Sequence, residues 1–189
     1  MNTAAVNRGY LKIEGAVKAF NFDFKDKVVL DIGSSTGGFT ELALKKGAKK
    51  VIAVEKGTNQ MKAPLRFDER IDLHEKTDVF EYRLTEDEKP DVIVADVSFV
   101  SLTKILKYAK IHLSKPSTRF LVMLKPQFEA NPGQLNRGVV KNEAIRRQII
   151  RDFEYFLKSN GFIVMNKRDN ELKGRTGNLE RFYDLILAK

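Results

Sequence analysis

The sequence predicts an α/β protein with one mostly parallel sheet of seven strands, an antiparallel edge, and helices on both faces. Short runs rich in Val, Ile and Leu alternate with longer segments in which apolar residues recur at helical spacing. This alternation is typical of parallel strands joined by helical crossovers, which cover both faces of the sheet. The last two strands are separated by little more than a loop that contains glycine, which predicts an antiparallel pair.

The elements are expected to form a single domain over residues 1–189, because the chain has no internal repeat and no linker. The second helix is expected to end at Gly47 and the last at Asn160-Gly161, since glycine commonly follows the last helical residue. The expected strands are residues 27–32, 51–55, 71–75, 92–95, 119–124, 162–167 and 179–187. The expected helices are residues 10–20, 39–46, 101–113 and 142–159. The residues of the last helix that are expected to face the core are Ile145, Ile149, Phe153 and Phe156 or Leu157.

The segment from Asp31 to Thr40 gives the strongest functional signal in the chain. A buried strand ends there, a turn of small residues follows, and a helix begins. Such a turn lets a ligand approach backbone N–H groups at a helix N-terminus, although a tight turn without a ligand is the simpler alternative. Because Ser35 occupies the middle glycine position, the spacing differs from the dinucleotide fingerprint G-x-G-x-x-G and resembles the first motif of S-adenosylmethionine-dependent methyltransferases. The predicted cofactor-binding residues of this segment are Asp31, Gly33, Ser34, Ser35, Thr36, Gly37, Gly38 and Phe39.

Charged residues also end or follow the other expected strands. Glu55 is the last residue of the second strand, Asp78 lies in the loop after the third, and Asp96 follows the fourth. Each charge alone is compatible with a solvated loop, but together they favour a site, because ligands bind beyond the carboxyl ends of strands in such sheets. Glu55 has the spacing of the acid that accepts hydrogen bonds from ribose hydroxyls, and Asp78 is placed to bind an adenine amino group. Asp31 is expected to order the turn and to face the amino-acid end of the cofactor.

Lys125 and Asp96 indicate the reaction. Lys125 directly follows a buried apolar strand and precedes Pro126, which fixes the chain. Burial and a nearby second cation make a lysine available as a base, and a ribose 2′-hydroxyl needs a base before it attacks a methyl sulfonium. Asp96 is expected to orient the lysine or the methyl group, and so to lie against the cofactor as well. The alternative is a structural Lys–Asp ion pair.

The charge balance favours a polyanionic partner, and nucleic acid is the polyanion that it favours most. The chain has 34 Lys and Arg against 25 Asp and Glu, a net charge of +9. Most of the 13 phenylalanines are expected at core-facing positions rather than on an exposed stacking surface. The basic residues assigned to loops that could meet RNA are Arg137, Lys141, Lys167, Arg168, Lys173 and Arg175.

Composition also excludes several classes of site. The chain has no cysteine, which rules out disulfides and zinc–thiolate sites, and no metal site is expected. It shows neither a signal peptide nor an apolar run long enough to span a bilayer. We therefore expect a cytoplasmic protein with no membrane partner.

Residues 127–140 are expected to form a long loop beside Lys125. The segment contains Pro132-Gly133 and Arg137-Gly138 and has few apolar residues. We interpret it as a mobile lid or an RNA-contacting loop, since loops of this length are uncommon without a function. A plain surface connection is the alternative.

Five motifs together resemble the TlyA (haemolysin A) family, which is close to the FtsJ ribose 2′-O-methyltransferases. The resemblance covers nearly the whole chain from Asn7 on, and it implies a Rossmann-like methyltransferase domain that uses S-adenosylmethionine and acts on ribosomal RNA in ribosomal subunits. The motifs are Asn7-Arg8-Gly9-Tyr10-Leu11-Lys12, the segment from Asp31 to Thr40, Asp96-Val97-Ser98-Phe99, Lys125-Pro126-Gln127-Phe128-Glu129 and Gly177-Asn178-Leu179-Glu180.

The resemblance implies a catalytic Lys-Asp-Lys-Glu tetrad at Lys12, Asp96, Lys125 and Glu180. Lys125 would be the base toward the 2′-hydroxyl, with Asp96 and Lys12 as its partners. Glu180 would position the substrate or Lys12. The chain departs from the family at residues 7–10, where the family usually has Ser-Arg-Gly-Gly. Full-length members also resemble a two-domain protein with a small RNA-binding domain of the ribosomal-protein type, which we expect to be absent here.

The predicted function is therefore ribose 2′-O-methylation of ribosomal RNA, with two alternatives from other classes. One is a cytolysin, as the family name suggests, which would need membrane-active segments and export. The other is a non-catalytic RNA-binding factor for ribosome assembly that keeps the cofactor fold. An NAD-dependent oxidoreductase is disfavoured, because the middle glycine is missing and no Tyr-x-x-x-Lys pair is evident.

Overall fold

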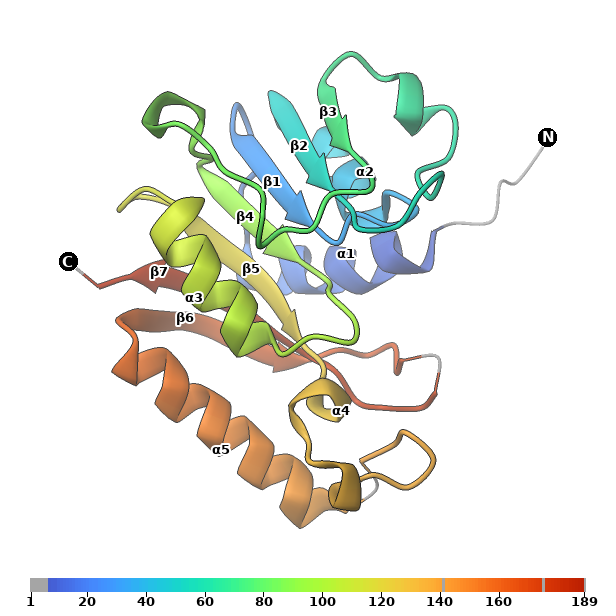
Figure 1. Ribbon diagram of the computed structural model, residues 1–189, viewed down its shortest axis with the longest axis vertical. Helices are drawn as coiled ribbons and strands as arrows, with labels where there is room; N and C mark the ends of the chain where they lie inside the picture. Colours follow the sequence, from blue (N-terminus) through green and yellow to red (C-terminus); the bar gives the residue numbers. More distant parts are fainter. Residues whose placement is uncertain (1–6, 141, 175, 189) are drawn as a thin grey trace.

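The computed structural model describes residues 7–140, 142–174 and 176–188, and it contains the predicted mostly parallel sheet (Figure 1). The strands are β1 (Val28–Ile32), β2 (Lys50–Val54), β3 (Ile71–His74), β4 (Val92–Ala95), β5 (Arg119–Leu124), β6 (Phe162–Asp169) and β7 (Arg181–Leu187). Their order in the sheet is β3-β2-β1-β4-β5-β7-β6. Because β7 runs antiparallel to both of its neighbours, the predicted antiparallel edge is confirmed.

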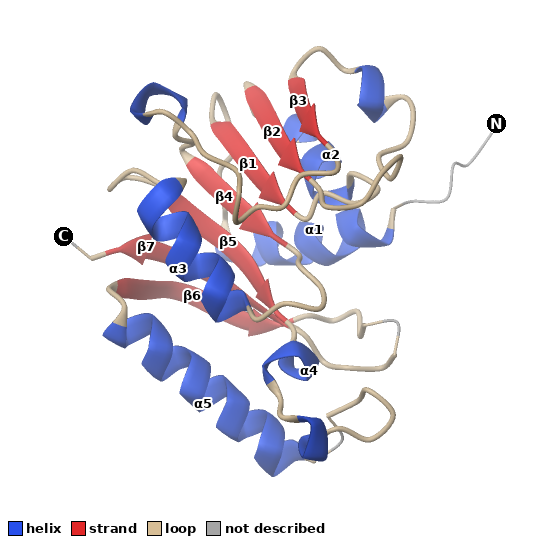
Figure 2. Cartoon of the chain, viewed as in Figure 1, coloured by secondary structure: helices blue, strands red, loops and turns tan. Residues whose placement is uncertain are grey.

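Helices cover both faces of the sheet, as predicted (Figure 2). The helices are α1 (Arg8–Phe20), α2 (Gly38–Lys45), α3 (Leu102–His112), α4 (Pro126–Glu129) and α5 (Glu143–Ser159). Side chains alternate between two cores along β1, where Val29 packs with α1 and α2, and Leu30 and Ile32 pack with α3 and α5. Every residue of β1 except Asp31 is apolar, because the strand is covered on both faces. No helix among the described residues combines the length and the apolar character needed to cross a membrane.

The differences from the predicted elements lie at their ends and in one loop. β6 extends to Asp169, and β7 begins at Arg181 rather than at residue 179. The expected loop at residues 127–140 contains α4 and a turn of 3-10 helix, Pro132–Gln134. On α5, Arg146 is buried while Ile145 is half-buried, because the Arg146 guanidinium forms an ion pair with Asp169 at 2.6 Å.

The parallel strands all end at one edge of the sheet, where their arrowheads point in Figure 2. β1 lies between β2 and β4, and β5 follows β4. The loops after these four strands therefore emerge next to one another at this edge. Every charged strand-end residue singled out in the sequence lies in one of these loops or next to them.

α1 packs closely against the first turn of α2, beside the loop that follows β1. Asn7 caps α1 by accepting a hydrogen bond from Gly9 N at 3.0 Å, and its Nδ2 donates to Thr36 Oγ1 at 2.8 Å. A Cβ placed on Gly38 would lie 2.6 Å from Tyr10 N. Glycine at position 38 therefore permits the two helices to approach.

This contact predicts opposite effects for two glycine-to-alanine substitutions in helices. Gly38→Ala is expected to lower the free energy of unfolding by about 2 kcal/mol, because α1 must move away from α2. Gly15→Ala in α1 has no atom within 4 Å of the new Cβ, and it is expected to raise the free energy of unfolding by about 0.5–1 kcal/mol. Urea unfolding of both variants measures this, and equal stability of Gly38→Ala and the wild type would contradict the close helix contact.

Candidate active site

The loop after β1 is a tight turn held against the ends of two neighbouring strands. Gly33 and Gly37 have φ values of 79° and 89°, in the left-handed region that favours glycine. Gly33 N and Ser34 N both donate to Val54 O, at 2.9 and 3.3 Å, which anchors the turn to β2. A Cβ on Gly33 would lie 3.2 Å from Asp96 O, so the turn also lies directly against the residue after β4.

Two buried polar side chains at this turn are only partly satisfied. Asp31 is fully buried, and its Oδ2 accepts a hydrogen bond from Thr40 Oγ1 at 2.7 Å. Asp31 Oδ1 and the buried Ser34 Oγ have no hydrogen-bond partner among the described residues. Burial raises the pKa of Asp31 to about 7, with smaller contributions from the charges of Asp96 and Glu55.

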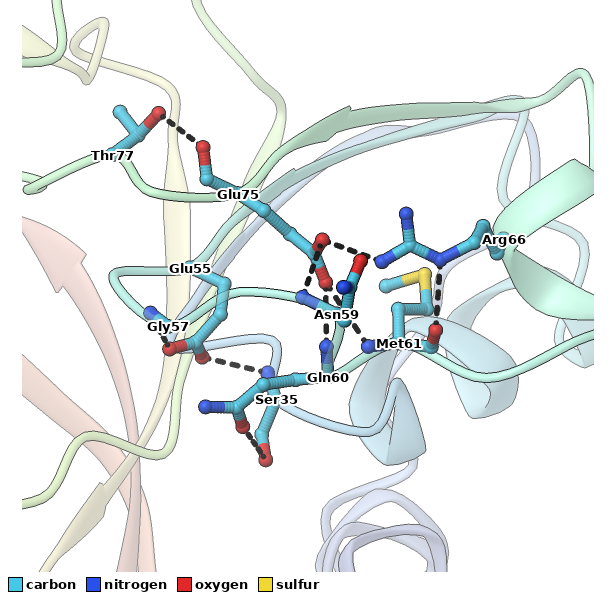
Figure 3. A network of polar contacts seen from close by, with 9 residues as sticks. All are labelled: Ser35, Glu55, Gly57, Asn59, Gln60, Met61, Arg66, Glu75 and Thr77. Carbon is cyan, nitrogen blue, oxygen red and sulfur yellow. Dashed lines mark hydrogen bonds and ion pairs between the residues drawn. The ribbon is translucent and has the colours of Figure 1, made fainter.

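Glu55 and Ser35 join the turn to the loop after β2. Glu55 Oε2 accepts from Ser35 N at 2.9 Å, and Oε1 accepts from Gly57 N at 2.6 Å (Figure 3). Ser35 also has a positive φ of 47°, and its hydroxyl donates to Gln60 Oε1 at 3.0 Å. Each carboxylate oxygen can accept a second hydrogen bond, so Glu55 keeps acceptor capacity for a diol.

Asp78, in the loop after β3, pairs with a residue of this loop. Its Oδ2 forms an ion pair with Lys56 Nζ at 2.8 Å, and its Oδ1 accepts from Phe80 N at 3.0 Å. The hydrogen bond from Lys56 lowers the pKa of Asp78. Thr77 N donates to Glu55 O at 3.0 Å, which ties the segment before Asp78 to the end of β2.

Three of the predicted cofactor-binding residues also have structural roles. The close approach of α1 requires glycine at position 38. Thr36 Oγ1 accepts a hydrogen bond from Asn7, the residue that caps α1. The side chain of Phe39 is buried in the core between α1, α2 and the sheet, with its ring centroid 6.1 Å from that of Phe182. For Phe39, only backbone atoms remain to face a ligand.

Glu75 organises the loop after β2, and the sequence analysis did not single it out. Its carboxylate accepts from the backbone N–H groups of Asn59, Gln60 and Met61, at 2.9, 2.8 and 3.2 Å (Figure 3). The Arg66 guanidinium pairs with the same carboxylate and donates to Met61 O at 3.0 Å. The Arg66 guanidinium and the three N–H donors lower the pKa of Glu75 to about 2. The loop that carries Gln60 to the glycine turn is therefore fixed by the half-buried carboxylate of Glu75.

The structure brings Lys125 and Asp96 together at the ends of β5 and β4. Lys125 is 9% exposed, and its Nζ lies 2.6 Å from Asp96 Oδ1. The same Nζ donates to Ser98 Oγ at 2.8 Å. Lys125 is the N-cap residue of α4, and Pro126 occupies the first helical position, which suits a residue with fixed φ.

The other two residues of the predicted tetrad form a second buried ion pair. Lys12 Nζ lies 2.6 Å from Glu180 Oε2, and the two residues are 8% and 2% exposed. The antiparallel pairing between β5 and β7 ends with Leu124 opposite Arg181. Lys125 and Glu180 are the residues that lie directly beyond this pair on the two chains. Among the described residues, no hydrogen bond or ion pair joins the two lysine–carboxylate pairs.

Phe99 departs from the expected core placement of phenylalanine. It is 92% exposed, and it has a positive φ of 64°, which is rare for a bulky residue. Its ring centroid lies 5.2 Å from that of Phe128, and Lys125 Nζ lies 5.9 Å from the Phe128 centroid. An exposed aromatic face therefore lies beside the lysine.

Two of the six basic residues assigned to RNA-contacting loops form ion pairs with acids. Lys167 and Arg168 lie in β6 and form ion pairs with Glu154 and Glu171. Lys141 and Arg175 lie outside the described residues. A groove of about 830 Å³ lies between α1 and the end of β6, and Arg168 lines it, but none of the predicted catalytic or cofactor-binding residues does. The predicted site therefore depends on the edge described above rather than on this groove.

The sheet order, the glycine turn after β1 and the acids after β2 and β4 define a Rossmann-like methyltransferase fold. A family model described as FtsJ-like methyltransferase matches residues 5–183, and the chain belongs to this family. The predicted family and the predicted class of enzyme are thereby confirmed.

Known proteins agree with this assignment. Hemolysin A of Brachyspira hyodysenteriae is 36% identical over 191 residues, covering 98% of this chain and 78% of the relative. The 23S rRNA (cytidine-2'-O)-methyltransferase TlyA of Campylobacter jejuni is 36% identical over 183 residues, covering 96% of this chain and 70% of the relative. The chain spans 63% of the length of a relative from Bacillus subtilis, 78% of the length of the Brachyspira relative and 70% of the length of the Campylobacter relative.

Solved structures show the same fold. A protein from Streptococcus thermophilus described as a hemolysin is 33% identical, with a TM-score of 0.92 over 100% of this chain and 69% of that chain. An S-adenosylmethionine-dependent methyltransferase from Mesorhizobium loti shares the fold at 14% identity, with a TM-score of 0.62 over 91% of this chain and 96% of that chain. The predicted fold class is confirmed.

The raised pKa of Asp31 predicts how stability depends on pH. The folded protein holds the Asp31 proton up to a pH of about 7, whereas the unfolded chain releases it near the ordinary value of 3.8. Stability is therefore expected to fall as the pH rises from about 4 to about 7, by at most on the order of 4 kcal/mol. Asp31→Asn is expected to flatten this part of the profile, as measured by urea unfolding at several pH values. A parallel profile in the variant would show that Asp31 is not the group responsible.

Proposed function

We propose that this chain binds S-adenosylmethionine at the carboxyl edge of the sheet and methylates a ribose 2′-hydroxyl of ribosomal RNA. The ion pair between Lys125 Nζ and Asp96 Oδ1, beside the glycine turn, is the observation that supports this proposal most strongly. Relatives from Campylobacter jejuni and Mycobacterium tuberculosis are named rRNA (cytidine-2'-O)-methyltransferases, which supports a cytidine as the target.

The residues around the turn fit the proposed cofactor. Asp31 Oδ1 and Ser34 Oγ are buried without a partner among the described residues, and such atoms normally find one. Asp31 would accept from the amino group of the cofactor, Glu55 from the ribose hydroxyls, and Asp78 from the adenine amino group. When bound, S-adenosylmethionine supplies a methyl carbon on a positively charged sulfur, which keeps the electron pair of the broken bond.

Lys125 has the position of a general base in this proposal. Its Nζ, once neutral, takes the proton of the 2′-hydroxyl while the hydroxyl oxygen bonds to the methyl carbon. Asp96, 2.6 Å away, stabilises the ammonium that forms, and Ser98 Oγ at 2.8 Å fixes the direction of Nζ. Lys12, held by Glu180, would bind the ribose or phosphate next to this hydroxyl.

The surface beside Lys125 is consistent with an RNA substrate. The exposed ring of Phe99 offers a flat apolar face, and single-stranded RNA bases stack on such rings. The net charge of +9 adds a long-range attraction for a polyanion.

Lysis of membranes is the second candidate, because the Brachyspira and Streptococcus relatives carry hemolysin names. Release of dye from liposomes by the purified chain would support it. Under the first proposal, the chain releases no dye while it transfers methyl groups to ribosomal subunits.

The base assignment predicts that Lys125→Arg is inactive. Arginine keeps the positive charge and the pairing with Asp96 but does not lose its proton in proteins. Transfer of labelled methyl groups to ribosomal subunits is expected to fall by about 10²–10⁴-fold, with binding of S-adenosylmethionine retained in calorimetry. In the wild type, nucleoside analysis is expected to place the label in 2′-O-methylcytidine.

Lys115→Arg is the matched control, because Lys115 pairs with Asp91 at 2.8 Å near the amino ends of the strands. This variant is expected to keep the wild-type rate. Full activity of Lys125→Arg would reduce the Lys125–Asp96 pair to a structural ion pair, and label on a base rather than a ribose would change the reaction class.

The loop held by Glu75 predicts a separate effect on cofactor affinity. Glu75→Gln leaves fewer acceptor sites for the three backbone N–H groups, so Gln60 and Glu55 are expected to lose their fixed positions at the turn. The Kd for S-adenosylmethionine is expected to rise roughly 10-fold, with little change in the rate at saturating cofactor. Asp68→Asn, which affects an exposed pair with Arg70, is expected to leave the Kd unchanged, and an equal change in both variants would contradict the role of Glu75.

A further inference from the structure

Glu129 links the two loops that hold Lys125 and Asp96. It is the last residue of α4, the short helix that begins directly after Lys125. Its Oε2 accepts from Ser101 Oγ and its Oε1 accepts from Leu102 N, both at 2.6 Å. Ser101 and Leu102 begin α3, in the chain segment that follows Asp96. The carboxylate therefore connects the loop after β5 with the loop after β4.

The chemistry of this contact makes it a strong connection. The Leu102 N–H is one of the donors that no helical carbonyl can satisfy at the start of α3. A carboxylate is the favoured acceptor there, because it meets both the free N–H group and the positive end of the helix dipole. Burial raises the pKa of Glu129, while the hydrogen bonds from Ser101 and Leu102 oppose that shift.

The same two loops meet again closer to the reacting atoms. The rings of Phe99 and Phe128 are in contact, with centroids 5.2 Å apart. Lys125 Nζ contacts both Asp96 and Ser98 across the same gap. Along the loop after β5, contacts to the loop after β4 therefore begin at Lys125 and end at Glu129.

We propose that Glu129 is a positioning residue for methyl transfer, which holds α4 against α3 so that Lys125 Nζ stays between Asp96 and Ser98. This inference rests on the proposed function, because it assigns a role to the neighbours of the proposed base. A base must lie within hydrogen-bond reach of the proton that it takes, and a displacement of about 1 Å can cost about 100-fold in rate. The loop that binds the cofactor is held separately, by Glu75.

The test compares Glu129→Ala with Glu129→Gln in the full chain. Glu129→Ala is expected to lower kcat by roughly 10- to 100-fold and to shift the midpoint of the kcat–pH profile, because Lys125 and Asp96 lose their fixed separation. The Kd and the binding stoichiometry of S-adenosylmethionine are expected to stay at wild-type values. Glu129→Gln is expected to restore most of kcat, because its amide oxygen can accept from Leu102 N and its NH₂ group can donate to Ser101 Oγ.

Asn142→Ala is the matched control for the loss of a helix cap. Asn142 Oδ1 accepts from Ala144 N and Ile145 N at the start of α5, at 2.8 and 3.2 Å. This variant is expected to lose stability without any shift of the kcat–pH profile. A kcat loss in Glu129→Ala that only follows a loss of cofactor-binding stoichiometry, with an unshifted profile, would make Glu129 a purely structural residue.

Failure of the inference and failure of the proposed function are distinguishable. If Glu129→Ala has the wild-type kcat and pH profile while Lys125→Arg is inactive, the positioning role of Glu129 is wrong and the base assignment stands. If Lys125→Arg is fully active, the base assignment is wrong, and the positioning role falls with it.

Discussion

The close contact between Gly33 and Asp96 is the constraint on which the whole edge of the sheet depends. β1 and β4 pair in parallel up to Ile32 and Ala95, and Asp96 N continues the pattern by donating to Ile32 O at 3.3 Å. The next residue of β1 is Gly33, where a Cβ would lie 3.2 Å from Asp96 O. The register between β1 and β4 thus fixes the position of the turn proposed to hold the cofactor and the position of the Asp96 carboxylate that pairs with Lys125. A one-residue slip would separate them, since it would turn every side chain of β4 to the other face.

Much of this architecture follows from local patterns in the sequence. A sheet that is covered on both faces requires apolar strands and helices with one apolar face, and both leave periodic patterns in the sequence. The strands, the long helices and the antiparallel end were therefore predictable. The α4 helix was not, because a single turn has no periodicity and is held by Glu129 contacting α3. The burial of Arg146 was missed for a similar reason, since its partner Asp169 lies on a strand that follows the helix.

The candidate site divides in the same way. Asp31, Glu55, Asp96 and Lys125 were predictable because the topology places the residues after parallel strands at one edge. Glu75 and Glu129 were not, since their hydrogen-bond donors lie well away from them along the chain and no spacing rule indicates such pairs. Gly38 has a second explanation besides the predicted cofactor contact, because the close approach of α1 also requires glycine at this position.

The ion pair between Lys12 and Glu180 has a consequence for how the domain is made. Lys12 lies in the first helix and Glu180 lies immediately before the last strand, so this part of the candidate site joins the two ends of the domain. β7 lies between β5 and β6, so Glu180 reaches its place only when the last strand has paired with β5. Contacts so distant in sequence form late and slow a folding reaction. During synthesis on the ribosome, the glycine turn can therefore form before the Lys12–Glu180 ion pair. Nascent chains acquire this ion pair only when nearly the entire domain has emerged.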